Sequence, residues 1–295
     1  MDDEEQDDEE QDDGNIRSDL MTFEIYIVVA VFAFIMEIID AGLGMGYGTV
    51  LSPLLIAMGF PPLVVVPSIL ISQAVGGLTA SVFHQKFRNV DYRPNITSIA
   101  EIRKIMRKDG YVDAVRKVFS RDDKIVLIVT VMGVLAAVIG AFAAVKLPTE
   151  ILKAYIGLLV LLIGIVMLLN RTFRFSWKRM LGLGLLASFN KGISGGGFGP
   201  VVTGGQVIIG NKDKSSIGCT TLAEAPICIA AFLMFILMKG VPDLSLAIAL
   251  SVGGACGAPL GALVTKSIKS GLLKFILALV ITALGAAVLL LSLSP

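Results

Sequence analysis

The sequence predicts an all-α integral membrane protein that consists of two inverted repeats. Roughly eight transmembrane helices are expected, including broken or re-entrant segments. Two observations support this fold class: the composition, and a glycine-rich cluster that occurs twice. The 295 residues are 55% hydrophobic and only 17% charged, with a mean hydropathy of +0.82. Soluble domains usually carry about 25% charged residues, so this composition excludes a water-soluble globule.

Residues 1–20 form a strongly acidic N-terminal segment. Ten of the 24 acidic residues lie in the first thirteen positions, so the remaining chain has 25 basic against 14 acidic residues. Such a like-charged, apolar-poor segment predicts a disordered tail. A cleavable signal peptide has a basic start and a short apolar core, so we expect the long apolar run at 22–40 to be retained.

Ten apolar stretches follow the tail. Six of them have the roughly 20 residues that a helix needs to cross the bilayer, whereas 49–58, 180–190 and 200–210 reach only about half way. The stretches are 22–40, 49–58, 62–83, 125–145, 150–169, 180–190, 200–210, 217–238, 244–265 and 272–293.

The segment 84–124 is the one substantial soluble part. It contains eleven of the 25 basic residues, and Ile99, Ile102 and Met106 recur at helical spacing. We expect one or two amphipathic helices that lie on the cytoplasmic interface and face lipid headgroups. A regulatory or partner-binding role is an open alternative.

The chain divides into two membrane repeats, 21–169 with the cytoplasmic insert 84–124, and 170–295. A shift of 151 residues aligns Gly44-Met-Gly-Tyr-Gly48 with Gly195-Gly-Gly-Phe-Gly199 without a gap. Such internal similarity indicates duplication. Basic loops concentrate on the cytoplasmic side of multi-pass proteins of the cell membrane. This rule places the N-terminal tail outside and makes the two repeats opposite in orientation.

The two glycine clusters predict a binding site for an anion. Non-helical backbone within a membrane is tolerated only inside protein or at a cavity, and helix N-termini attract negative charge. The alternative is that glycine merely allows close helix packing. The expected substrate-binding residues are Gly44, Gly46, Gly48, Ser52, Lys191, Ser194, Gly195, Gly196, Gly197, Gly199 and Thr203.

Four ionisable residues lie in apolar segments, where charge is costly and usually functional: Glu37, Asp40, Lys191 and Glu224. The repeat aligns Asp40 with Lys191 and Gln73 with Glu224. Asp40 and Lys191 are expected either to pair across the pseudo-symmetry axis or to leave Lys191 available to the substrate. Asp40, Gln73 and Glu224 are expected to act in gating or coupling, with Glu224 as a proton carrier; a structural, hydrogen-bonded role is the alternative.

Other classes of function are disfavoured. The three cysteines have no close pairing and His84 has no histidine partner, so no metal site or cofactor is expected. The glycine spacing does not match a dinucleotide fingerprint. The basic loops fit membrane anchoring better than nucleic-acid binding.

The chain resembles the TauE/SafE family of sulfite exporters, also called TSUP anion transporters. The resemblance covers about residues 22–293. It depends on the Gly-Met-Gly-Tyr-Gly string, Gly59-Phe-Pro-Pro62, the Phe83-His84-Gln85 exit, the segment from Asn190 to Pro200, and Thr221-Leu-Ala-Glu224. The resemblance implies a permease for small sulfur-containing or organic anions such as sulfite and sulfonates.

We therefore expect a secondary transporter, not an enzyme. The anion would be held between the glycine turns near the midplane, with proton coupling and homo-oligomer formation left open. An anion channel is the main alternative, and a membrane-embedded enzyme is disfavoured because no catalytic dyad or metal motif is present.

Overall fold

The computed structural model describes residues 24–92, 98–169, 177–208, 213–240, 243–265 and 270–293. The predicted acidic tail 1–20 lies outside the described residues. Among those that are described, the regular secondary structure is entirely helical, which confirms the predicted all-α class.

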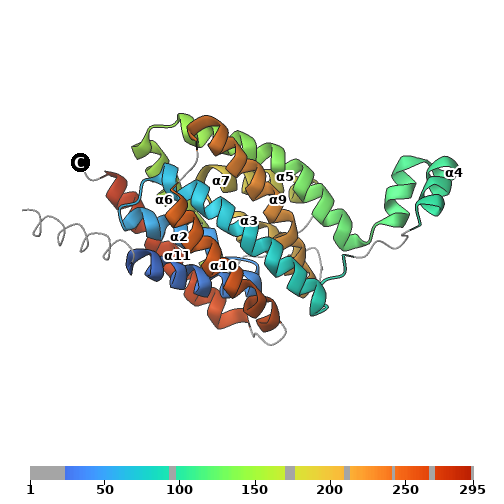
Figure 1. Cartoon of the computed structure of the whole chain (residues 1–295), viewed down its shortest axis with the longest axis horizontal. Coiled ribbons are helices and arrows are strands. Elements are labelled where there is room, and N and C mark those ends of the chain that lie inside the picture. Colours follow the sequence, from blue (N-terminus) through green and yellow to red (C-terminus); the bar gives the residue numbers. More distant parts are fainter. Residues whose placement is uncertain are drawn as a thin grey trace, which may run out of the picture.

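The helices agree closely with the predicted apolar stretches (Figure 1). The N-terminal helix spans Glu24–Leu43. It is followed by α2 (Tyr47–Ala57), α3 (Pro62–Lys86), α4 (Ile99–Val118), α5 (Arg121–Lys146), α6 (Thr149–Leu168), α7 (Trp177–Ser194), α8 (Phe198–Ile208), α9 (Asp213–Lys239), α10 (Leu244–Val264) and α11 (Ser270–Leu293).

Six helices in the described part of the chain are long and apolar enough to cross a membrane: the N-terminal helix, α3, α5, α6, α9 and α10. The exposed large side chains of the bundle are mostly aliphatic, such as Leu135, Ile139 and Leu237. A lipid environment accounts for them because hydrocarbon chains solvate apolar side chains as well as a protein core does. The chain is therefore a multi-pass membrane protein.

The predicted half-length helices are correct at two of three positions. Helices α2 and α8 have 11 residues each, which corresponds to about 16 Å. The prediction for 180–190 is wrong, since α7 has 18 residues and a length of about 27 Å. The polar run at its end, which includes Asn190 and Lys191, is buried, so its side chains find partners inside the protein and the helix continues to Ser194.

Each half of the chain packs one of its helices against helices of the other half. Helix α5, from the first half, packs on α7 and α9, whereas α10, from the second half, packs on α3. Glycines on α10 also lie against the N-terminal helix: a Cβ at Gly253 would be 2.2 Å from the carbonyl oxygen of Ala30. Helices α6 and α11 pack together, as do α3 and α9. The two halves are therefore interleaved in space.

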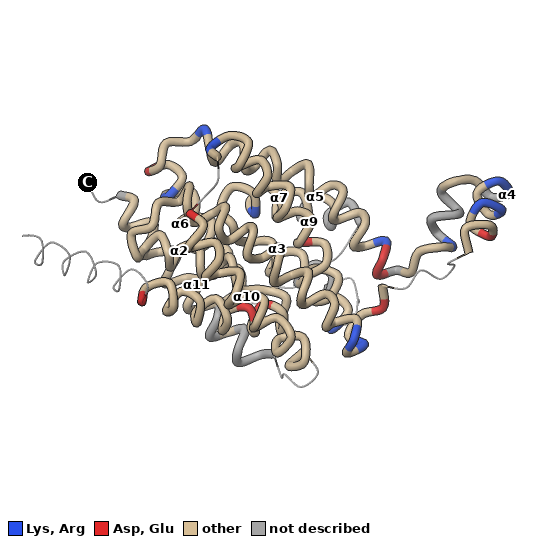
Figure 2. Tube along the Cα trace, viewed as in Figure 1, with Lys and Arg blue, Asp and Glu red and all other residues tan. Residues whose placement is uncertain are grey.

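Helix α4 lies apart from the bundle (Figure 1) and contains much of the charge seen outside it (Figure 2). Gly110 interrupts the helix with φ 84° and ψ 171°. The sequence predicts one or two helices in the insert, and the structure has two helical segments joined at Gly110. Ile99 and Tyr111 are each 76% exposed.

Candidate functional site

Two glycine turns interrupt the membrane helices at equivalent positions. The first joins the N-terminal helix to α2, and the second joins α7 to α8. Gly44 and Gly195, which the 151-residue shift aligns, have φ of 72° and 73°. The next aligned pair, Gly46 and Gly197, has φ of 132° and 82°. Glycine is needed here because these backbone angles are strained for other residues. The sequence repeat is therefore also a repeat of backbone conformation.

The two turns touch each other. A Cβ added to Gly48 would lie 1.9 Å from the carbonyl oxygen of Gly195, and one at Gly199 would lie 2.5 Å from that of Gly44. One at Gly196 would lie 2.8 Å from the carbonyl oxygen of Gly48. These glycines allow close backbone approach, as the packing alternative expected. The glycine clusters thus serve both to turn the chain and to bring the turns together.

Hydroxyl groups join the turns across this contact. Ser52 Oγ of α2 donates to the carbonyl oxygen of Ser194 at 2.7 Å, and the aligned Thr203 Oγ1 of α8 donates to that of Gly44 at 2.9 Å. Thr49 Oγ1 accepts the N–H of Gly197 at 3.1 Å. The predicted residues Ser52 and Thr203 therefore lie at the turns and satisfy carbonyl groups that would be costly to bury unpaired.

Several predicted peptide donors already have partners. The N–H groups of Gly44 and Gly195 donate to the carbonyl oxygens of Asp40 and Lys191, one helical turn earlier. The N–H of Gly196 donates to Ser194 Oγ at 3.2 Å. A buried peptide N–H without a partner is costly, and these three groups pair within the protein.

Lys191, Glu224 and Gln73 form a buried polar cluster. Lys191 Nζ lies 2.6 Å from Glu224 Oε1, and the two side chains are 1% and 8% exposed. Lys191 Nζ also donates to Gln73 Oε1, and Gln73 Nε2 donates to Glu224 Oε1 at 3.2 Å. Helices α3, α7 and α9 each supply one member. The predicted residues Gln73 and Glu224 are thus in direct contact.

The cluster is adjacent to the glycine turns. A Cβ added to Gly48 would lie 2.9 Å from Gln73 Oε1 as well as against Gly195. Gln73 therefore connects the buried ion pair to the closest point between the two turns. A single place in the protein brings together a buried cation, a carboxylate, an amide and two interrupted helices.

Pairing of Asp40 with Lys191, one of the two alternatives left open by the sequence, is not found among the described residues. Asp40 Oδ1 accepts the N–H of Tyr47 at 3.1 Å, in the first turn of α2. A carboxylate is favourable at this position because of the positive end of the helix dipole. Lys191 pairs instead with Glu224, whose position on α9 lets it meet the lysine directly.

Sequence reasoning missed two tyrosines beside the site. Tyr47 Oη donates to Ser72 Oγ at 2.9 Å or to the carbonyl oxygen of Leu250 at 3.1 Å, and it joins α2 to α3 and α10. Tyr155 Oη of α6 donates to Asn190 Oδ1, next to Lys191. Tyr47 lies within the glycine cluster, and its hydroxyl must find a partner if buried. Tyr155 lies in an ordinary apolar run, and nothing in the sequence distinguishes it.

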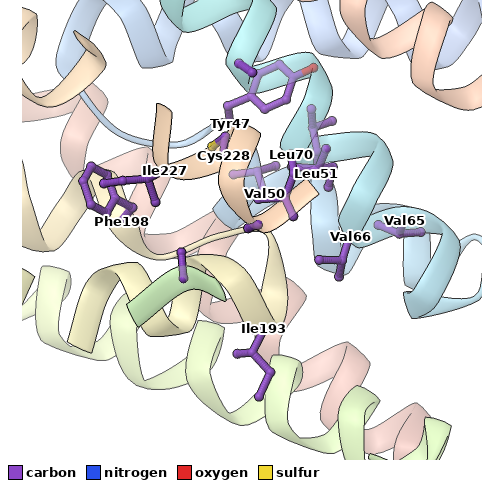
Figure 3. Close-up of a cluster of buried hydrophobic side chains, with 14 of the residues drawn as sticks. Tyr47, Val50, Leu51, Val65, Val66, Leu70, Ile193, Phe198, Ile227 and Cys228 are labelled. Atoms are coloured by element: carbon purple, nitrogen blue, oxygen red, sulfur yellow. The ribbon is translucent and has the colours of Figure 1, made fainter. Parts of the chain in front are cut away.

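Apolar side chains surround the cluster. Figure 3 shows Tyr47, Val50 and Leu51 of α2 near Leu70 of α3, with Cys228 of α9 close by. Tyr47, Leu51, Leu70 and Cys228 are 0% exposed. A low-polarity surrounding strengthens the attraction between opposite charges and raises the cost of separating them. The ion pair is therefore costly to separate at this depth.

The comparisons with known proteins agree with this architecture. The model of the family described as "Sulfite exporter TauE/SafE" matches residues 29–100 and 111–288. The chain is 27% identical over 252 residues to the "Probable membrane transporter protein YtnM" of Bacillus subtilis (strain 168), which covers 80% of this chain and 73% of the relative. No solved structure matches it. A family match over most of the chain, together with the transporter relative, shows that this protein belongs to the sulfite exporter TauE/SafE family and is a membrane transporter rather than an enzyme.

Proposed function

We propose that the protein is a secondary transporter of small anions, namely sulfite, sulfonates or other sulfur-containing organic anions. The observation that carries the proposal is the buried Lys191, which is 1% exposed and lies next to both glycine turns. A cation at this depth is expensive to maintain and is usually functional. Its ammonium group supplies the charge that a small anion requires inside the membrane.

Glu224 is the anionic partner of Lys191 in the structure. Its Oε1 is 2.6 Å from Lys191 Nζ, the position that an oxyanion would take. An incoming sulfite or sulfonate competes with the carboxylate for this ammonium group. Gln73 contacts both side chains, so its amide can hydrogen-bond to either the Glu224 carboxylate or the incoming anion.

Proton coupling follows from this competition. When the anion displaces Glu224 from Lys191, the carboxylate loses its counter-charge within the bilayer. Protonation then removes the cost of an isolated buried charge. We propose Glu224 as the residue that takes up a proton as the anion binds, and Asp40 as the group that holds the start of α2 through Tyr47.

The orientation of the protein is part of the proposal. The insert with α4 and the other basic loops would be cytoplasmic, and the N-terminal tail would be outside. The repeats would then be inverted about the site, as in transporters that alternate access around a midplane site.

Counterflow in proteoliposomes tests this function. The purified chain is reconstituted into liposomes that are loaded with unlabelled sulfite, sulfate, thiosulfate, sulfoacetate or a carboxylate. Entry of the same labelled anion into these liposomes is then measured. The proposal expects saturable, trans-stimulated entry of at least one sulfur-containing anion. Entry that follows voltage without trans-stimulation would instead identify an anion channel, and no entry of any of these anions would refute the proposal.

A further inference from the structure

Glu37 is a second buried acid near the site, for which sequence reasoning gave no specific role. It lies on the N-terminal helix and is 2% exposed. Its carboxyl group is packed against α3, since a Cβ added to Gly76 would be 2.9 Å from both its Cδ and its Oε1. Its own Cβ lies against α10, 3.0 Å from where a Cβ of Gly257 would be. Two glycines thus make the room that this side chain occupies.

The Glu37 carboxyl group has no hydrogen bond or ion pair with any residue that the structure describes. The neighbouring acids differ in this respect. Asp40 accepts a peptide N–H from Tyr47, and Glu224 accepts from Lys191. An ionised carboxylate without a partner in the membrane costs several kcal/mol, and protonation avoids most of that cost.

Two other acids and one lysine lie near Glu37. The groups that act on it are Asp40 of its own helix, Lys191 of α7 and Glu224 of α9. Tyr47 of α2 and Cys228 of α9 are the neutral titratable groups nearby. Helix α10 contains no Asp, Glu, Lys, Arg or His, and His84 of α3 lies about two turns beyond Gly76.

Three acids therefore share one cation, and Glu224 already occupies that cation. If all three were ionised, the buried cluster would hold an excess negative charge, and Asp40 has only a peptide dipole to offset its own. Among the described residues, Glu37 is the acid without a hydrogen-bond or ion-pair partner, and a bound proton lowers the free energy most there.

We infer that Glu37 is a second proton-binding site of the transporter, protonated in the arrangement described here and deprotonated when the pair of Lys191 and Glu224 opens. The inference deepens the proposed function, since it assigns a coupling residue to the same anion pathway. The step is a simple exchange, in which the carboxylic acid loses its proton to water that enters the opened site and regains it on closure. Glu37 and Glu224 then respond to different events, opening and anion binding.

Transport driven by a pH gradient tests the inference. The full chain, as wild type, Glu37→Gln, Glu37→Asp and Glu150→Gln, is reconstituted with thiosulfate or sulfoacetate, whichever the wild type exchanges. Both anions keep their charge near neutral pH. Glu150 is a matched control because its side chain is 62% exposed on α6. We expect Glu37→Gln to reduce gradient-driven accumulation to the level without a gradient, and the other two variants to retain it. Full gradient-driven accumulation by Glu37→Gln would overturn the inference.

Infrared spectroscopy of the purified protein gives a second readout that needs no transport. A protonated carboxyl in an apolar site has its own C=O stretching band, separate from that of carboxylate. Glu37→Gln should remove this band, and Glu37→Asp should shift it if the glutamine variant does not fold. A wild-type spectrum without the band, or a band that neither variant changes, would contradict the inference. Absence of wild-type exchange with the band present would count against the proposed function alone.

Discussion

Lys191 is the residue whose environment says most about this protein. Its ammonium group is buried, paired with Glu224 and bonded to Gln73. Replacing a buried ion pair with apolar residues is often neutral for stability, whereas removing one partner is strongly destabilising. A buried ion pair is therefore weak evidence for a stabilising role, and in the proposed function it marks the place where the anion binds.

Removal of Lys191 alone should destabilise the protein. In Lys191→Met, Glu224 remains buried without its counter-charge, which should lower the free energy of unfolding by about 3–5 kcal/mol. The double variant Lys191→Met with Glu224→Gln should recover most of this loss, because no isolated charge remains. Thermal unfolding in detergent measures both. Equal destabilisation of the single and double variants would show that the isolated carboxylate of Glu224 is not the cause of the loss in free energy of unfolding.

Replacement of Glu224 should change the response to pH. Glutamine keeps the shape but binds no proton, and it leaves Lys191 without a competing carboxylate. In Glu224→Gln, anion exchange should lose the part of its pH dependence that comes from proton uptake on anion binding, and the KM for the anion should fall. Initial rates of exchange across a range of pH check this expectation. A pH profile that matches the wild type would exclude Glu224 as the residue that takes up a proton when the anion binds.

The sequence was informative at this scale wherever charge stood in an apolar segment. The sequence predicts Lys191, Glu224 and Gln73 as site residues, and the last two, which the repeat aligns, are in contact in the structure. The partner of Lys191 was open, and pairing with Asp40 was one of the two alternatives. Spacing along the chain cannot decide which acid reaches a given lysine, because that depends on how α7 and α9 pack.

At the level of elements, the glycine turns decide how closely the two broken helices approach. Positive φ at Gly44 and Gly195 turns the chain, and the bare Cα of Gly48 admits the carbonyl oxygen of Gly195. These are separate requirements, and together they explain why glycine recurs so densely in both clusters. A side chain at either kind of position forces the turns apart or strains the backbone.

Gly48→Ala should separate the turns. Its Cβ would lie 1.9 Å from the carbonyl oxygen of Gly195, and overpacking of this kind typically costs about 1–3 kcal/mol or more. We expect a lower unfolding temperature and loss of anion exchange. Gly182→Ala is the matched control, because it lies in α7 with no atom within 4 Å of the added Cβ. Wild-type exchange by Gly48→Ala would show that close contact of the turns is unnecessary.

The element boundaries could be predicted well because apolar runs in membrane proteins end where charge or proline begins. Helices α2, α3 and α10 start within two residues of their predicted positions. Helices α5 and α9 begin four residues before their predicted positions, and α7 extends beyond both ends of the predicted stretch 180–190. The last turns of α7 contain Ser188, Asn190 and Lys191, whose burial depends on contacts that hydropathy does not detect.

At the scale of the whole molecule, the two halves are interleaved rather than separate. Helix α5 packs against α7 and α9, and α10 packs against α3. The ion pair between Lys191 and Glu224, and its contact with Gln73 of the first half, lie where the halves meet. The repeat itself was visible in the sequence, but this exchange of helices was not, because the insert with α4 shifts the register after α3.

The proposed orientation predicts which face of the membrane α4 occupies. Tyr111 is 76% exposed on α4. In a background without Cys219, Cys228 and Cys256, Tyr111→Cys should react with a membrane-impermeant maleimide only after the cells are opened. A tag at the N-terminus should be accessible on intact cells. Labelling of Tyr111→Cys on intact cells would contradict the cytoplasmic position of the insert.

The central claim is that Lys191 binds the transported anion at the glycine turns. Exchange of the labelled anion by the double variant Lys191→Met with Glu224→Gln tests it most directly, since this variant should fold without leaving an isolated charge. The account predicts a folded, membrane-inserted protein with no exchange above that of empty liposomes. Exchange by this variant at the wild-type rate, with an unchanged KM, would contradict the account.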